Sequence, residues 1–495
     1  MKKAVMLPLV AAISGAMVGC GGGGGGGSTP PAPSLTYYTF SFYKPAEVDY
    51  NPASSCTVFD IYEDTASQPA KLKAMNYLAI GTSLDSLIKA IYSDENGVQV
   101  GTEVSTVNGS LRIALENIPN NGYVTIQEQY GPAVYAQSFS KEVLTSDTSM
   151  RNTFISVLNP ASKGSCLTGN NDAPRTITSL SYANDEDASG NPNIRIYFDS
   201  QLETIESTNT SLDSIEGVNK ESTMISQYRT TDRSQLFQYG FDGWNNNTMK
   251  FTGNQGTADT SKSQIVSDNL QPNKIELNVI YNNFMYELAE LSVANDQAAF
   301  YHPDERLGES WAYSMSGSIA AAGWEASYQD VIAPNSWSIS IDDEGLFMSN
   351  NANDAKASVS NETVDVRASI GINSEKGLQR IAYEQGDGAG YLVKHTVYTH
   401  ISPTVKIPKL DLSEFDSSVA DNLRITSTSK ISQSYLFTEN DKDVVLADFM
   451  TAFRHGGHGN VDNDSMSIVK SLQDMRYTLN NIAQTRSYYL HRYDN

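Results

Sequence analysis

Residues 110–126 read Ser-Leu-Arg-Ile-Ala-Leu-Glu-Asn-Ile-Pro-Asn-Asn-Gly-Tyr-Val-Thr-Ile, and they indicate the fold class more clearly than any other stretch. Leu111, Ile113 and Leu115 alternate with residues that face the other way, the two-residue period of a strand with one buried face. A Pro-Asn-Asn-Gly turn then leads to a second strand that starts at Val124. We therefore predict a β-hairpin here, in a mainly β protein.

Strand signals continue upstream of this stretch. Tyr38, Phe40 and Phe42 also follow a two-residue period, and an Asp-Glu-Asn-Gly turn follows the apolar run Ile88–Tyr92. The segment 88–126 resembles the carboxypeptidase-regulatory or transthyretin-like β-sandwich modules, and three dipeptides carry the resemblance: Asn108-Gly109, Ile118-Pro119 and Gly122-Tyr123. The resemblance implies a structural or binding module without catalytic residues.

The chain has three cysteines, and two of them flank this first globular segment. Cys56 and Cys166 can pair in an oxidising compartment, whereas the alternative is two buried free thiols. We predict the disulfide, which would hold the two ends of a β-sandwich domain at 35–170 together.

The rest of the chain divides into a β-rich region at 174–435 and a small helical segment at 436–495. The β-rich region is compatible with one large domain or two smaller ones, and its strand signals are Ile194–Phe198, Ile275–Tyr281, Trp337–Ile341, Val364–Ile372 and Tyr391–Ile401. Apolar residues at helical spacing predict two C-terminal helices, at 445–453 and 468–482. Their apolar stripes suit packing on the protein's own core, or alternatively a partner. The predicted fold class is mainly β, with tandem antiparallel β-sandwich-like domains and this helical segment.

The N-terminus has the three parts of an export signal. Lys2 and Lys3 precede an apolar run that ends at Val18, and this run is shorter than the ~20 residues that span a bilayer. Met17-Val18-Gly19-Cys20 resembles the lipobox of bacterial type II signal peptides, although Met17 stands where that family usually has Leu. The resemblance implies cleavage of a signal peptide at residues 1–19 and lipidation of Cys20.

Residues 20–34 join the lipidated cysteine to the first domain. Seven glycines and a Ser-Thr-Pro-Pro-Ala-Pro stretch follow Cys20, a composition typical of a tether with a reach of roughly 20 Å. Several acyl chains on Cys20 would hold the protein at a membrane. In the lipoprotein family, Gly21 after the cysteine rather than Asp favours the outer membrane. We expect a lipid-anchored outer-membrane protein that faces the cell surface.

The net charge of −23 excludes nucleic acid as an expected partner, because the phosphate backbone would repel the chain. Asp185, Asp187 and Ser189 match three positions of an EF-hand-like calcium loop, yet Ile196 occupies the position of the bidentate glutamate. A surface turn is the favoured interpretation, calcium is the alternative, and we predict no other cofactor.

Three histidines are candidates for a metal site or a catalytic role. His455 and His458 lie close together in a predicted loop, but two imidazoles make an incomplete metal site. His395 shares a strand face with Val393 and Val397, which predicts a hydrogen-bonded core histidine. We therefore predict no metal site and no catalytic residues.

All four tryptophans lie between residues 244 and 337. Tyr239, Asp242 and Trp244 combine aromatic faces with a carboxylate, as a sugar-binding surface does, whereas the alternative is packing in a sheet core. Core packing is the favoured interpretation, also for Trp311 and Trp324.

Together these patterns predict a surface-exposed lipoprotein with a structural, coat-like or adhesive role and no catalytic activity. A glycan-binding or glycan-processing lipoprotein, using the segment around Trp244, is one alternative. A cell-envelope assembly factor that grips a partner with its C-terminal helices is the other. The expected partners are the membrane, through the lipid anchor, and other envelope proteins or glycans.

Overall fold

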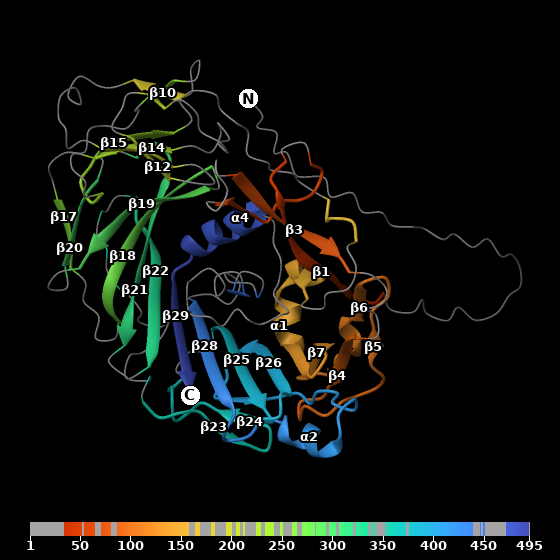
Figure 1. Cartoon of the computed structure of the whole chain (residues 1–495). Helices are drawn as coiled ribbons and strands as arrows, with labels where there is room; N and C mark the ends of the chain where they lie inside the picture. Colours follow the sequence, from red (N-terminus) through yellow and green to blue (C-terminus); the bar gives the residue numbers. More distant parts are fainter. Residues whose placement is uncertain are drawn as a thin grey trace, which may run out of the picture. The chain divides into compact units, whose positions relative to one another are not determined.

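A computed structural model describes residues 34–495 except for the segments 52–53, 65–70, 81–86, 158–163, 169–179, 184–194, 200–203, 208–210, 213–223, 229–232, 242–247, 251–259, 265–269, 283, 294–296, 303–305, 320–322, 335–336, 338, 340, 342–351, 353, 373–375, 439–445, 447–448, 451–471 and 495. The described part is mainly β, as predicted, with large sheets and few helices (Figure 1).

The first sheet is built around one long strand. It contains β1 (Tyr37–Asp49), β2 (Asp60–Asp64), β3 (Lys71–Ala79), β6 (Ser110–Ala114) and β9 (Asn152–Ser156) in the order β2-β3-β1-β6, with β9 parallel to β1. Tyr38, Phe40 and Phe42 of β1 are buried, while the residues between them are half-buried. The predicted two-residue period of this strand is therefore confirmed.

The predicted hairpin at 110–126 is wrong. β6 pairs with β1, whereas β7 (Tyr123–Tyr130) pairs with β4 (Ile88–Ser93) and β8 (Ala133–Ser140) in a different sheet. The 3₁₀ turn η2 (Leu115–Asn117) and the Pro119 turn carry the chain from one sheet to the other. Gly122 allows this passage, because a Cβ there would lie 2.3 Å from the Ser93 carbonyl oxygen. The two strands face each other across a core rather than sharing hydrogen bonds.

A twelve-stranded sheet forms the centre of the fold (Figure 1). Its order is β19 (Phe284–Ser292), β18 (Leu270–Tyr281), β21 (Ser310–Ile319), β22 (Trp324–Ile332), β29 (Ser487–Asp494), β28 (Lys430–Thr438), β25 (Gly377–Gly386), β26 (Leu392–His400), β8, β7, β4 and β5 (Val104–Ser105). Its neighbours are antiparallel except β26 and β8, which run parallel.

Strands from all three predicted regions share this sheet. β4, β5, β7 and β8 come from 35–170, and β29 comes from 436–495. Six strands come wholly from 174–435: β18, β19, β21, β22, β25 and β26. Residues 36–495 accordingly form one compact unit. The boundaries predicted near residues 170 and 436 therefore do not separate sheets, because β26 hydrogen-bonds to β8 and β29 to β28.

Both faces of the twelve-stranded sheet are buried along its central strands. Leu436 and Tyr489 on one face pack in a core shared with β1 and β6 of the five-stranded sheet, which gives the sandwich-like arrangement predicted for the N-terminal part. Tyr435, Phe437 and Leu490 on the opposite face belong to a second and larger core. The sequence of a strand with two buried faces is a continuous apolar and aromatic run, without alternation of apolar and polar residues.

The remaining strands form smaller sheets. They are β10 (Leu180–Ala183) with β13 (Ser211–Leu212) and β16 (Thr248–Lys250); β11 (Arg195–Asp199) with β12 (Thr204–Ser207), β14 (Met224–Tyr228) and β15 (Leu236–Phe241); β17 (Thr260–Gln264) with β20 (Gln297–Tyr301); and β24 (Thr363–Asp365) with β23 (Ser358–Ser360) and β27 (Thr404–Lys406). The described helices are α1 (Lys141–Ser146), the 3₁₀ turn η3 (Thr148–Arg151), α2 (Ser417–Asn422) and α4 (Leu472–Ala483).

Three of the strand signals predicted in 174–435 correspond to β11, β18 and β26. The prediction at Val364–Ile372 is too long, because β24 ends at Asp365 and a turn follows. Trp337–Ile341 is not a strand at its described positions, 337, 339 and 341.

The C-terminal segment is only partly helical. α4 confirms the second predicted helix, and Leu446, Phe449 and Met450 of the first are helical and buried. The prediction missed β29, which ends the chain inside the sheet. Its sequence, Ser-Tyr-Tyr-Leu-His-Arg-Tyr-Asp, lacks the apolar and polar alternation because seven of its eight residues are buried.

Candidate functional site

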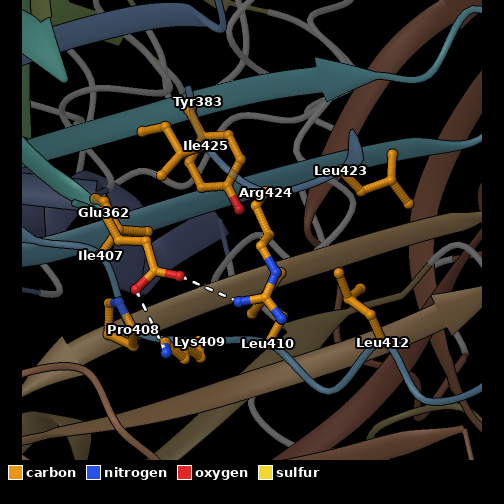
Figure 2. A pocket seen from close by; sticks show the side chains of 10 residues that line it. All are labelled: Glu362, Tyr383, Ile407, Pro408, Lys409, Leu410, Leu412, Leu423, Arg424 and Ile425. Carbon is orange, nitrogen blue, oxygen red and sulfur yellow. Dashed lines mark hydrogen bonds and ion pairs between the residues drawn. The ribbon is translucent and has the colours of Figure 1, made fainter. Parts of the chain in front are cut away.

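A hollow lies where the loop after β27 passes over the twelve-stranded sheet (Figure 2). It is shallow and open to solvent, and its enclosed volume is about 20 Å³. Four of its lining residues are polar and are described below. The other six form aliphatic walls: Ile407, Pro408, Leu410, Leu412, Leu423 and Ile425. The hollow therefore combines an apolar lining with a few polar groups, but its enclosed volume suits about one water molecule.

The loop that forms one wall of the hollow is tied to the sheet beneath it. The Gln127 side chain donates to the Asp411 carbonyl oxygen at 2.7 Å and accepts from the Asp411 N–H at 3.0 Å. The Asp411 carboxylate also pairs with Lys89 of β4. Because Gln127 is buried and Lys89 and Asp411 are half-buried, the loop is held in a defined position, and the apolar wall it carries is preformed.

Glu362 enters the hollow from a tight turn between β23 and β24. Ser360 and Thr363 pair across a two-residue loop in which φ is +50° for Asn361 and +57° for Glu362. Positive φ at both positions is the geometry of a type I′ turn, in which Asn followed by Gly is the preferred pair. Glutamate at the second position carries conformational strain of order 1–3 kcal/mol. The turn therefore places a carboxylate where backbone preference alone would place glycine.

Three cations surround this carboxylate. Arg424 Nη1 lies 3.2 Å from Glu362 Oε1, while the Nζ atoms of Lys406 and Lys409 each lie 3.7 Å from Oε2, as Figure 2 shows for Arg424 and Lys409. At 3.7 Å the lysines attract the carboxylate without a hydrogen bond. The side chains of Lys409 and Arg424 are 42% and 47% exposed, so both can also reach a group that enters from solvent.

The fourth polar group is the hydroxyl of Tyr383, on β25. The residue is only 5% exposed, and its side chain is directed toward the part of the hollow beside Arg424 (Figure 2). Burial raises the pKa of Tyr383, and the charge of Glu362 adds to the rise, so the hydroxyl keeps its proton. Among the residues that the structure describes, none forms a hydrogen bond with this hydroxyl. The hydroxyl opens onto the hollow, where water can pair with it.

This geometry predicts different outcomes for two buried tyrosines on adjacent strands. The Tyr435 hydroxyl donates to Gln433 Oε1 at 2.9 Å and accepts from Gln379 Nε2 at 3.3 Å. We expect Tyr435→Phe to lower the free energy of unfolding by about 1–3 kcal/mol, because it leaves a buried amide unsatisfied. Tyr383→Phe is expected to change it by less than about 0.5 kcal/mol, or to raise it. Urea unfolding of both variants checks this, and an equal loss in the two would mean that the Tyr383 hydroxyl has a structural partner.

The aromatic segment predicted as a ligand site is only partly described. Trp244 and Asp242 lie outside the described residues, while Tyr239 is fully buried on β15. The Tyr239 hydroxyl donates to Glu309 Oε1 at 2.7 Å, and the same oxygen accepts from Trp311 Nε1 at 2.7 Å. These groups satisfy one another inside the protein, so at Tyr239 core packing is confirmed over a ligand surface.

The other tryptophans also pack internally. Trp324 is 2% exposed and Trp311 is fully buried, as the core interpretation predicts. His302 stacks on the Trp337 ring at 4.4 Å, and the Arg306 guanidinium carbon lies 4.5 Å from the centre of the same ring. The protein's own side chains thus already contact the Trp337 ring.

His395 is a buried core histidine, as predicted. Its Nε2 lies 2.6 Å from Ser138 Oγ, which in turn lies 2.6 Å from Thr125 Oγ1. His395 Nδ1 has no hydrogen-bond partner among the described residues. The pair resembles a nucleophile and its base only in composition, because Ser138 is fully buried and His395 is 1% exposed.

The burial of His395 predicts a dependence of stability on pH. Burial lowers its pKa from the ordinary 6.5 to about 3, so the folded protein resists protonation that the unfolded chain accepts. The free energy of unfolding is therefore highest above pH 6.5 and decreases as the pH falls toward 3. The loss reaches about 2 kcal/mol at pH 5. We expect His395→Gln to lose less stability between pH 7 and pH 5 than the wild type in urea unfolding. His400→Gln, at the half-buried end of the same strand, is the control, and equal slopes for His395→Gln and the wild type would contradict the expectation.

Of the remaining predicted site residues, the structure places the cysteine pair. Cys56 and Cys166 form the expected disulfide, with an S–S distance of 2.01 Å. The other candidates lie outside the described residues: Cys20, Asp185, Asp187, Ser189, His455 and His458. The lipidation and calcium interpretations therefore stay predictions.

The hollow itself was missed by sequence reasoning. Glu362, Tyr383 and Arg424 belong to three separate segments, and no motif connects them. The available signal was local: Asn361-Glu362 lies between two short Val-containing runs, which is the pattern of a two-residue hairpin loop. That signal predicts the turn but not the cations that face it.

Comparisons with known proteins do not identify a family. No protein-family model matches the chain, and no curated protein matches its sequence. In the described part, no helix is both long and apolar enough to cross a membrane, and no three His, Cys, Asp or Glu side chains are grouped to hold a metal ion.

Proposed function

We propose that this chain is a lipid-anchored outer-membrane protein that faces the cell surface and has a structural or adhesive role. The anchor is Cys20, and the tether at 20–34 carries the folded unit. The observation that supports this role is the twelve-stranded sheet, in which β8 hydrogen-bonds to β26 and the last strand, β29, lies between β22 and β28. Both faces of its central strands β28 and β29 are buried, which suits a rigid coat or contact module.

The disulfide supports an oxidising location. Disulfides persist in exported proteins and are rare in reducing compartments. Cys56 and Cys166 close a loop across a sequence separation of 110 residues. Export and lipidation are consistent with that location, and the proposal assigns no catalytic residue.

Protease treatment of intact cells tests the location. We expect the anchored protein to be digested in intact cells, and the Cys20→Ser variant to be lost from the membrane fraction. Lysed cells provide the accessibility control. Protection of the wild type until lysis would place it inside the envelope and overturn the coat and adhesive roles.

A glycan-binding role remains the alternative for the segment around Trp244. Tyr239 is already bonded to Glu309, so a glycan there would depend on Asp242 and Trp244. Binding to a glycan array that disappears in Trp244→Ala would favour this alternative over the structural role.

A further inference from the structure

We propose that the side chains of Lys89 and Asp411 join in an amide bond, and that Glu103 moves the proton in this reaction. Lys89 belongs to β4, Glu103 directly precedes β5, and Asp411 lies between β27 and α2. The bond is a covalent modification that the chain forms by itself, without an enzyme. The inference goes beyond the proposed coat or adhesive role and does not depend on lipid anchoring, because all three residues belong to the folded unit 36–495.

The Lys89 amine contacts two carboxylates. Its Nζ atom pairs with Asp411 Oδ2 and lies 3.1 Å from Glu103 Oε2. The other Asp411 oxygen, Oδ1, accepts from the Ser413 N–H at 3.0 Å. The amine is therefore held against the carboxyl group that it attacks, and a backbone donor stabilises the negative charge that develops on Oδ1.

The main chain around Asp411 is fixed in this position. Gln127 on β7 lies opposite Lys89 in the sheet, and its side-chain amide bonds both the N–H and the carbonyl oxygen of Asp411. Two residues earlier, the Lys409 N–H donates to the Gly97 carbonyl oxygen at 3.0 Å. Well-oriented groups in one molecule reach effective concentrations of about 10⁵ M or more, and this favours condensation to an amide even in water.

The surroundings of the three groups suit the proton transfer that has to come first. The reaction needs a neutral amine and a neutral acid, and a proton that passes from Lys89 to Asp411 supplies both at once. The exposed fractions of these two side chains are 17% and 15%, and partial burial favours the neutral pair relative to the ion pair. Glu103 is more exposed, at 29%, and stays a carboxylate that can act as a base.

The bond then forms by condensation. The neutral Lys89 Nζ attacks Asp411 Cγ, the N–C bond forms, and the Glu103 carboxylate accepts a proton from the nitrogen. Glu103 returns this proton to the hydroxyl group on Cγ, the C–O bond breaks, and one water molecule leaves. The product is an amide, Glu103 is again a carboxylate, and the reaction needs no oxidant, reductant or cofactor.

Mass spectrometry of a tryptic digest of the full chain tests the proposal. In the wild type we expect residues 74–112, uncut at Lys89, to be linked to residues 410–424. The linked species should have the summed mass of the two peptides less one water molecule. Lys89→Arg and Asp411→Ala should each give unlinked peptides only. Recovery of unlinked 410–424 from the wild type, with cleavage at Lys89, would show an ion pair without a covalent bond and would overturn the proposal.

Two further measurements test the chemistry of the cluster. In Glu103→Gln the yield of linked peptide should fall at least about tenfold, because the group that moves the proton is lost. Its circular dichroism spectrum should match that of the wild type, which separates loss of the bond from loss of the fold. The pair of Lys73 and Asp49 is the matched control in the same digest and should stay unlinked, because the Asp49 side chain is 68% exposed. Linked peptide at the wild-type yield in Glu103→Gln would overturn the role of Glu103.

Discussion

Deleting residues 487–495 is expected to abolish cooperative folding of the unit 36–495, although it removes only the end of the chain. These residues form β29, which pairs with β22 from Trp324 to Gln329 on one side and with β28 from Ile431 to Thr438 on the other. Without β29, two long strands lose their partner in the middle of the sheet, where both faces are buried. Buried backbone groups without partners are costly, so local fraying cannot accommodate the loss.

The polar residues at the C-terminal end of β29 also stabilise the fold. Arg492 Nε lies 2.7 Å from Asp494 Oδ1, and both side chains are almost fully buried. Asp494 Oδ2 also accepts from Gln433 Nε2 at 2.5 Å and from the Ala357 N–H at 3.1 Å. We expect Asp494→Ala alone to cost about 3–5 kcal/mol, because it leaves a buried guanidinium without its carboxylate.

Thermal unfolding followed by circular dichroism measures the effects of the deletion and of Asp494→Ala. Deletion of residues 21–27, which lie outside the compact unit, is the control and should melt like the wild type. A chain that lacks residues 487–495 but retains the wild-type melting temperature would show that β29 is dispensable.

Replacing both Cys56 and Cys166 with serine is expected to lower the free energy of unfolding by about 4–5 kcal/mol, the second large effect. The bond closes a loop with a sequence separation of 110 residues, and in the chain-entropy model long loops gain most from closure. The segment around Cys166 also pairs with β3, because the Leu167 N–H donates to the Tyr77 carbonyl oxygen and the Ala79 N–H donates to the Ser165 carbonyl oxygen. Loss of the disulfide should therefore also weaken the pairing of residues 165–167 with β3.

Urea unfolding with and without a thiol reductant measures how much the disulfide contributes to the free energy of unfolding. The reduced wild type should match the double variant, while Cys20→Ser, which removes a cysteine outside the folded unit, should match the oxidised wild type. A double variant with an unchanged urea midpoint would show that the pairing along β3 holds the segment without the bond.

The position of β29 also affects the assembly-factor hypothesis. Deleting residues 440–495 would remove α4 and β29 together. Loss of a partner in that variant would follow from loss of the sheet, so it would not assign partner binding to the helices. Substitutions at exposed positions of α4, such as Asp474, are the appropriate test.

Much of the local structure follows from short-range patterns. The period of Tyr38, Phe40 and Phe42 predicted the buried face of β1, and the turn after Tyr92 lies where the Asp-Glu-Asn-Gly stretch indicated. The disulfide followed from cysteine arithmetic, since only one pair remained after Cys20. None of these inferences required a partner far away in the chain to be identified.

The candidate site could not be predicted in the same way. Glu362, Tyr383 and Arg424 come from a hairpin turn, a central strand and a loop, and each is unremarkable in its own segment. Their charges and the Tyr383 hydroxyl acquire meaning only when the chain brings the three segments to one hollow.

The sequence by itself determined the buried face of β1, the turn after Tyr92 and which cysteines can pair, because these properties depend on short-range patterns or on residue type. Only the tertiary structure decided that β6 and β7 lie in different sheets, that β8 runs parallel to β26, and that the last strand lies in the middle of the sheet. Strand pairing is decided by the burial of whole faces and the satisfaction of backbone hydrogen bonds over long sequence separations. A two-residue period records which face of a strand is buried but not which strand lies beside it.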